Sequence, residues 1–119
     1  MNWLFYYIGL WIEYFDGVIA TDLVIVANDA GAAGALPNRT YLMNPVTLNT
    51  AFTLPAASLN LAARFTIKNN QVSSGFDVTF VAANGTDTLE QQAVGLTTLE
   101  NLDQFTVESD GVSNWVVVG

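Results

Sequence analysis

The side chains of this chain that could do chemistry are mainly carboxylates, because the sequence contains neither histidine nor cysteine. Seven acidic residues of the C-terminal half are the candidates for a catalytic pair: Asp77, Asp87, Glu90, Glu100, Asp103, Glu108 and Asp110. Two such carboxylates can hydrolyse a glycoside when one is the acid and the other the nucleophile or base. The same residues also keep a sparsely charged surface soluble, and we interpret them in that way.

Other kinds of catalysis have less support. A base that titrates near neutral pH is most often histidine, and no nucleophile motif surrounds the only lysine, Lys68. The acids at 87, 90, 100 and 103 are hard oxygen donors, but their spacing is not that of an EF-hand calcium loop. Gly31 and Gly34 stand in a GAAGA stretch without the lysine of a phosphate-binding loop. We therefore predict that the protein is not an enzyme and uses no metal or cofactor.

The composition indicates a chain that is apolar for its size. Hydrophobic residues make up 51% of the 119 residues and charged residues 12%, about half of the ~25% that is usual for soluble domains. This predicts that other chains cover part of the apolar surface. Arg39, Arg64 and Lys68 are the only cations against eleven acids, for a net charge of −8. Nucleic acid binding needs clustered cations, so we exclude that class.

Residues 1–20 form a separate aromatic-rich segment. Its uninterrupted apolar run, from Trp3 to Ile12, is ten residues long, whereas a membrane-spanning helix needs about twenty. Aromatic side chains dominate protein interfaces, so we predict that Trp3, Phe5, Trp11 and Phe15 dock on another protein. Two alternatives stay open: a strand or helix of the domain's own core, and attachment to a membrane interface through residues 1–19.

Residues 21–46 are predicted to be a strand followed by an arm. The stretch ATDLVIVA at 20–27 has the short, valine- and isoleucine-rich composition of a buried strand. The stretch NDAGAAGALPN at 28–38 is small, contains glycine and ends at a proline, as in a linker or an extended arm laid over a neighbouring chain.

Residues 47–119 are predicted to be a β domain with short antiparallel strands. Apolar residues alternate with polar ones, which is the pattern of half-buried strands. The alternating apolar residues are Phe52 with Leu54, Phe65 with Ile67, Phe76 with Val78 and Phe80, and Phe105 with Val107. Turn sequences at 69–70, 74–75, 84–85 and 110–111 separate these strands.

A hairpin at the end of the chain is the most specific expectation. Residues 105–107 should pair with 115–117, with Trp115 packed on Phe105 or Val107. The residues expected to form the β core and the packing between chains are Phe65, Ile67, Phe76, Phe80, Phe105 and Trp115.

Residues 50–119 resemble the trimeric β modules of bacteriophage fibres, tail spikes and head-decorating fibres. The resemblance lies in Leu54-Pro55, in Arg64-Phe65-Thr66-Ile67-Lys68-Asn69, and in Ser109-Asp110-Gly111 followed by Asn114-Trp115. The chain departs from the pattern at Ala62-Ala63, where these modules often have glycine. The resemblance implies an intertwined or closely packed trimer.

We therefore expect a virion structural protein, such as a short fibre, spike or decoration protein. It would assemble as a homotrimer and dock on a capsid or tail protein through its N-terminal segment. Two alternatives are a lectin-like receptor- or glycan-binding tip and a membrane-anchored spike. The glycan-binding alternative would use polar loop residues, namely Asn70, Gln71, Asn84 and Gln91.

Overall fold

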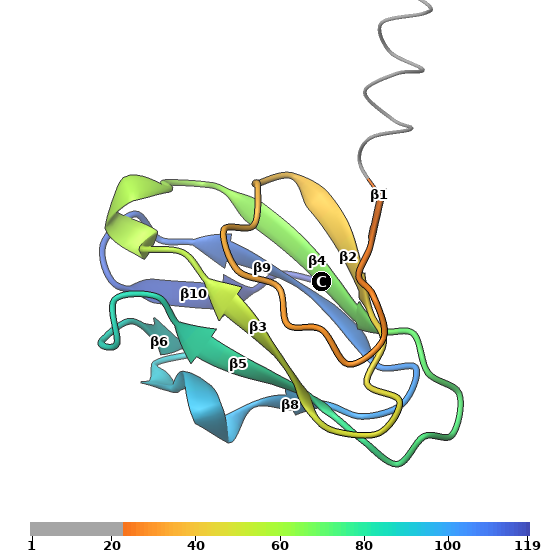
Figure 1. The fold of residues 1–119 in the computed structure, drawn as a ribbon. Helices are drawn as coiled ribbons and strands as arrows, with labels where there is room; N and C mark the ends of the chain where they lie inside the picture. Colours follow the sequence, from red (N-terminus) through yellow and green to blue (C-terminus); the bar gives the residue numbers. More distant parts are fainter. Residues whose placement is uncertain (1–22) are drawn as a thin grey trace, which may run out of the picture.

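The computed structural model describes residues 23–119, so the predictions for Trp3, Phe5, Trp11 and Phe15 lie outside the described residues. Residues 23–119 form two packed β-sheets and two short 3-10 helices, with no α-helix among them (Figure 1). The prediction of a mainly β fold is confirmed.

The large sheet has seven strands in the order β1-β2-β4-β9-β10-β6-β7. In chain order these are β1 (Leu23–Ile25), β2 (Arg39–Met43), β4 (Arg64–Asn69), β6 (Thr88–Leu89), β7 (Gln92–Ala93), β9 (Gln104–Ser109) and β10 (Asn114–Val117). Residues 23–46, which the sequence suggested as a strand and an arm ahead of the β domain, thus contribute β1 and β2 to the same sheet as β4 and β9.

The small sheet has three strands in the order β3-β5-β8. They are β3 (Thr50–Leu54), β5 (Val78–Ala82) and β8 (Thr98–Leu99). The 3-10 helices are η1 (Ala57–Leu59), between β3 and β4, and η2 (Val94–Leu96), between β7 and β8.

Both sheets are mixed, so the prediction of antiparallel pairing was wrong for half of the strand pairs. The β1–β2, β2–β4, β3–β5 and β6–β10 pairs are parallel. For β2–β4 and β3–β5 the cause is that the chain changes sheet at each step from β2 to β5. β3 is thus the crossover between β2 and β4, and β4 is the crossover between β3 and β5. A crossover connection brings its two strands together in parallel, whereas a hairpin makes them antiparallel.

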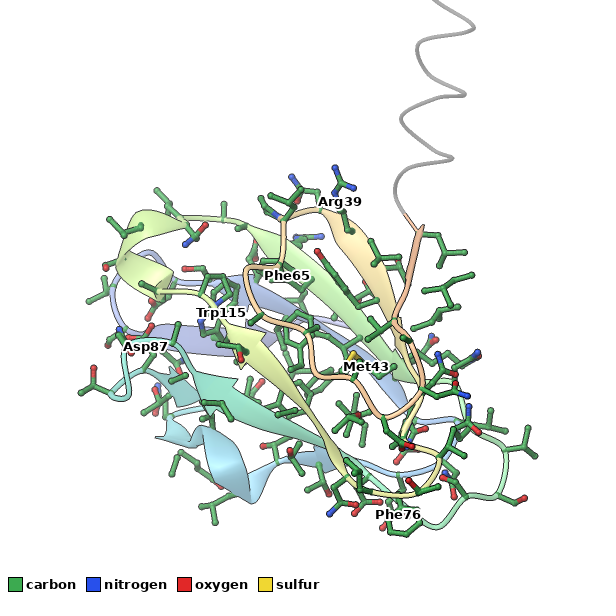
Figure 2. All side chains as sticks on the ribbon, in the orientation of Figure 1. Arg39, Met43, Phe65, Phe76, Asp87 and Trp115 are labelled. Atoms are coloured by element: carbon green, nitrogen blue, oxygen red, sulfur yellow. The ribbon has the colours of Figure 1, made fainter. Side chains whose placement is uncertain are left out.

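The core lies between the two sheets and is closed by the chain itself. Phe52 of the small sheet has its ring centroid 5.2 Å from that of Tyr41 and 5.8 Å from that of Phe65, both in the large sheet. Phe65 in turn lies 5.4 Å from Trp115. Figure 2 shows Phe65, Met43 and Trp115 between the layers. These edge-on and tilted contacts are favoured by aromatic rings and join four strands of the two sheets.

Four of the six residues predicted for the β core and for packing between chains are buried in this interior: Phe65, Ile67, Phe80 and Trp115. Phe105 is half-buried at its margin, 5.1 Å from Phe80 between ring centroids. Phe76 is half-buried in the loop before β5 and does not belong to the core cluster (Figure 2). The four buried side chains are covered by their own chain.

The terminal hairpin is present, but its tryptophan packs differently from the prediction. β9 and β10 are antiparallel, with Trp115 opposite Ser109 and Val117 opposite Val107. The Trp115 ring points into the core against Phe65, and its Nε1–H donates a hydrogen bond to the Pro55 carbonyl at 3.2 Å. In this register Val117, and not Trp115, lies opposite Val107, so the hairpin is shifted by two residues from the predicted pairing.

The arm before β2 lies on its own chain, whereas the sequence suggested a neighbour. The Ala32 amide donates to the Ala51 carbonyl at 3.0 Å, and the Thr53 amide donates to the Ala32 carbonyl at 2.8 Å. The arm therefore pairs with β3 at the edge of the small sheet. A glycine at position 31 suits this contact, because a Cβ atom there would lie 3.0 Å from the Ala51 oxygen. The strand predicted within residues 20–27 is present as β1, but it is not buried, because Ile25 is 71% exposed.

Candidate interaction surface

The outer face of the large sheet is the side that points away from the core. Its side chains alternate along each strand with buried ones, and all are exposed or half-buried. We use the name outer face for Leu23, Ile25, Thr40, Leu42, Arg64, Thr66, Lys68, Gln104, Thr106, Glu108, Val116 and Val118. The middle strands β4 and β9 supply only polar and charged residues, and β2 supplies Thr40 and Leu42. The remaining residues, from β1 and from the chain end at β10, are aliphatic.

Strand register sets the order of these residues. Thr40, Thr66 and Thr106 are paired across β2, β4 and β9, which makes a row of three threonines at the centre of the face. The hydroxyls of Thr66 and Thr106 are hydrogen bonded at 2.8 Å. The next row toward the C-terminal end of β4 contains Leu42 and Lys68, followed by Gln104 on β9.

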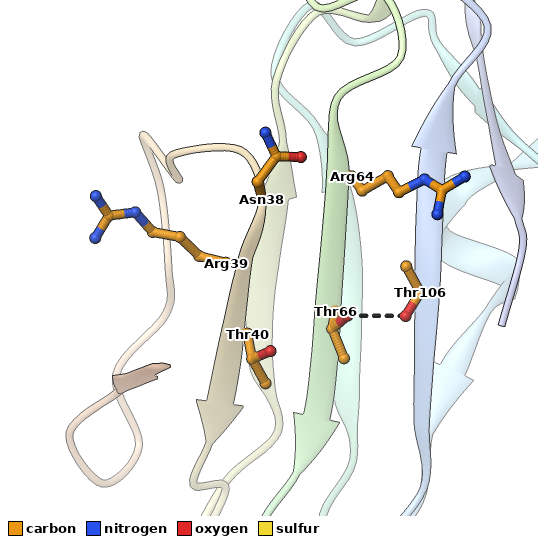
Figure 3. A pocket seen from close by; sticks show the side chains of 6 residues that line it. All are labelled: Asn38, Arg39, Thr40, Arg64, Thr66 and Thr106. Carbon is orange, nitrogen blue, oxygen red and sulfur yellow. Dashed lines mark hydrogen bonds between the residues drawn. The ribbon is translucent and has the colours of Figure 1, made fainter. Parts of the chain in front are cut away.

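The threonine row forms the floor of a shallow hollow of about 350 Å³ (Figure 3). Its lining is wholly polar and consists of Asn38, Arg39, Thr40, Arg64, Thr66 and Thr106. Two of the three cations of the chain therefore stand at one hollow. Figure 3 shows, however, that the two arginine side chains point in opposite directions, so their guanidinium groups do not converge on one ligand position.

The charges on the outer face are partly paired. Arg64 Nε lies 3.2 Å from Glu108 Oε1 on the neighbouring strand, and both side chains are in contact with solvent. An exposed pair of this kind contributes at most about 1 kcal/mol to stability. Lys68 makes no ion pair with any residue between 23 and 119. The face thus carries an uncompensated positive charge next to aliphatic side chains.

Three loops meet at the end of the domain where β3 ends. The buried carboxylate of Asp87 accepts a hydrogen bond from the Ala57 amide at 2.8 Å, and the Ser109 hydroxyl donates to the Ala57 carbonyl at 2.8 Å. These bonds join the loop around η1 to the two turns at 84–87 and 109–114. The loops so fixed expose Leu59, Leu61 and Val112 to solvent, which gives this end an apolar surface.

The carboxylates of Asp29 and Asp110 each accept several hydrogen bonds from loop groups. This structural role was not predicted from the sequence for either residue. Hydrogen bonds from the Thr47 amide and hydroxyl, and from the Val46 and Leu48 amides, hold the pKa of Asp29 below its ordinary value. The pKa of Asp110 is lowered by the amides of Val112, Asn114 and Ser113, all donating to Oδ1. An aspartate ahead of a turn is the sequence signal for the second of these.

Acidification is expected to weaken the fold through these two carboxyls. Each folded-state pKa lies below the ordinary 3.8, so the stabilising contribution is complete above about pH 4 and is lost as the pH falls through the lower, folded value. The variant Asp110→Asn keeps an oxygen acceptor but has no charge. Its urea midpoint should therefore change less than that of the wild-type chain between about pH 5 and pH 2. The same slope in both proteins would contradict this role for Asp110.

The polar loop residues of the glycan-binding alternative do not gather at one place. Gln71 lies near the end of β4, where its Nε2 donates to Asn44 Oδ1 at 2.8 Å. Asn84 lies in the turn after β5, and its Oδ1 accepts from the Thr86 and Asp87 amides at 3.0 Å. Their polar atoms are thus used within the chain.

Three of the seven acidic candidates interact with other groups of the chain at separate places. Asp87 is bonded to a loop amide, Asp110 caps a turn, and Glu108 pairs with Arg64. Residues 23–119 contain no group of three histidine, cysteine, aspartate or glutamate side chains placed to hold a metal ion. In the same part of the chain, no helix has the length and apolarity needed to cross a membrane.

The described residues therefore define a two-layer β domain with a solvent-facing sheet surface rather than a cleft. Comparison with protein-family models, with curated proteins and with solved structures finds no match for this chain.

Proposed function

We propose that this chain is a virion structural protein, a short fibre, spike or decoration protein, that assembles as a homotrimer. In this proposal the N-terminal residues Trp3, Phe5, Trp11 and Phe15 attach the trimer to a capsid or tail protein. The resemblance of residues 50–119 to trimeric phage modules supports the proposal, as does a fold made of short strands.

The observation that carries the proposal is the uncovered outer face with its aliphatic margins. Leu23 and Ile25 on one side, and Val116 and Val118 on the other, are exposed around the polar centre. β1 is moreover an edge strand of the sheet. An exposed hydrophobic edge strand invites pairing with another chain and is normally covered or charged.

Assembly through this face would leave the core of each chain intact. Phe65, Ile67 and Trp115 are enclosed within one chain. The trimer would therefore bury side chains of the outer face and leave the core between the two sheets unchanged. Each chain would then fold first and associate afterwards. Association would stabilise the folded state further by mass action, because only folded chains bind one another.

The molar mass of the full-length chain in solution tests the proposal. Light scattering at micromolar concentration should give three times the chain mass of 12.8 kDa. Dilution should shift the mass toward one chain as the complex dissociates. A chain that remains monomeric at every concentration would refute assembly as its function.

A further inference from the structure

The charges of this acidic chain are segregated on its surface. Arg64 and Lys68 point outward from the large sheet, and Arg39 lines the hollow at its margin. These are all the cations of the sequence. Residues 23–119 contain eight acids, and only Glu108 lies on the outer face. The other seven acids of residues 23–119 therefore lie away from the outer face, on parts of the chain that carry no cation except Arg39.

One of those surfaces combines acids with exposed leucines. The segment 88–103 runs from β6 through β7, η2 and β8 to the turn before β9, along the side of the domain that bears the small sheet (Figure 1). We call it the acidic strip, because Glu90, Glu100 and Asp103 are exposed and it contains no lysine or arginine. Leu96 is 72% exposed and Leu102 is 49% exposed within the same strip.

We infer that the outer face of one copy binds the acidic strip of the next copy in the ring. This inference rests on the proposed homotrimer and names the two surfaces that meet. Lys68 and Arg64 would face Glu100 and Asp103 of the neighbour, while the aliphatic side chains of Leu42, Val116 and Val118 would cover Leu96 and Leu102.

Charge and symmetry both favour this arrangement. Contact between two outer faces would join surfaces on which Arg64 and Lys68 are balanced by a single acid, Glu108, and like charges opposed at an interface are costly. Contact between an outer face and an acidic strip joins opposite charges. It uses two different surfaces of each chain, and such heterologous contacts generate closed rings when the rotation between neighbours closes. A twofold dimer would need a self-complementary surface instead.

Charge reversal in the full-length chain tests the contact. Lys68 and Glu100 are suitable because neither side chain makes an ion pair within residues 23–119. Each of Lys68→Glu and Glu100→Lys should raise the dissociation constant of the trimer by roughly tenfold or more, as expected for opposed like charges. The double variant should recover most of the loss. Raising the salt concentration should weaken the wild-type trimer and reduce the difference between variants.

A matched control separates this contact from a general effect of charge. Ser58→Lys adds a cation at an exposed position of η1, outside both the outer face and the acidic strip, and should change the dissociation constant less than twofold. The urea unfolding midpoint of the dissociated chain should be the same in all variants.

The outcomes distinguish the inference from the proposed function. A wild-type chain that never trimerises overturns both. A wild-type trimer that tolerates Lys68→Glu and Glu100→Lys without loss overturns the inference and leaves the trimer intact. Loss in both single variants without recovery in the double variant also overturns the pairing of these two surfaces.

Discussion

Replacing Trp115 with alanine is expected to lower the free energy of unfolding by about 3–5 kcal/mol, the range for truncating a large buried aromatic residue. The Trp115 side chain is fully buried against Phe65, and its indole N–H is bonded to the Pro55 carbonyl. Alanine would leave a cavity between the sheets and an unpaired carbonyl. Because small domains are stable by only about 5–15 kcal/mol, a large share of the stability would be lost. Urea unfolding followed by circular dichroism measures the change.

The neighbouring residue provides the control for Trp115. Val116 lies on the same strand with its side chain on the outer face, where it is 37% exposed. In the dissociated chain, Val116→Ala should cost less than about 1 kcal/mol, as most exposed substitutions do. Comparable losses in the two variants would mean that Trp115 is not the centre of the core.

Replacing Asn69 with alanine is the second substitution for which we expect a large loss, about 2–5 kcal/mol. The buried Asn69 Nδ2 donates to the carbonyls of Phe76 and Leu99 at 3.0 and 3.1 Å, and Oδ1 accepts from the Gln71 amide at 3.1 Å. One side chain thus joins the end of β4 to the loop before β5 and to β8 in the other sheet. Removing it leaves polar groups without partners, each at a cost of about 1–3 kcal/mol.

Thr50→Val tests whether the loss of stability in Asn69→Ala comes from the backbone groups that lose their hydrogen bonds to the Asn69 side chain. Thr50 is buried too, but its Oγ1 has no hydrogen-bond partner. Valine has nearly the same shape, and its introduction removes a hydroxyl without leaving any other group unpaired. The urea midpoint should therefore stay the same or rise. If Thr50→Val lost as much stability as Asn69→Ala, unpaired hydrogen-bonding groups would not be the cause of the loss in Asn69→Ala.

The strand pattern could be predicted from the sequence because one face of each strand is buried. Phe65 and Ile67 alternate with Thr66 and Lys68 in β4, and the first pair does lie in the core. The turn at Asp110-Gly111 also gives the expected hairpin, with Gly111 at φ +78°. Alternation and turn residues are local signals, so they locate strands and hairpins reliably.

The partners of the strands could not be predicted in the same way. The turn at Asn69-Asn70 indicates that β4 ends there, but it does not indicate that β5 belongs to the other sheet. Parallel pairs such as Thr40 with Thr66 join residues far apart in sequence, and no local pattern specifies them. The threonine row and the hollow depend on that register, so they could be recognised only in the folded chain.

The interaction surface was predictable only in part. The charged fraction of 12% led us to expect that other chains cover part of the apolar surface, which stays a prediction; the described residues do expose apolar side chains such as Ile25 and Leu96. Of the residues expected to form both the β core and the packing between chains, Phe65, Ile67, Phe80 and Trp115 are buried in the core, as the large apolar area of such side chains favours. Leu23, Ile25 and Val116 are exposed because their side chains point away from the core, to the outer face of the large sheet. Which side of a strand faces the core is decided by the packing of the two sheets and so by the whole fold.

The position of β4 between β2 and β9 has a consequence for folding during synthesis of the chain. β4 takes its two neighbours from opposite directions along the sequence, β2 before it and β9 long after it. A chain emerging from the ribosome therefore exposes one edge of β4 until residue 109 has been made. Such distant pairings close slowly, on a scale of about milliseconds to seconds, and in that interval the unfinished edge is open to chaperones or to a wrong strand.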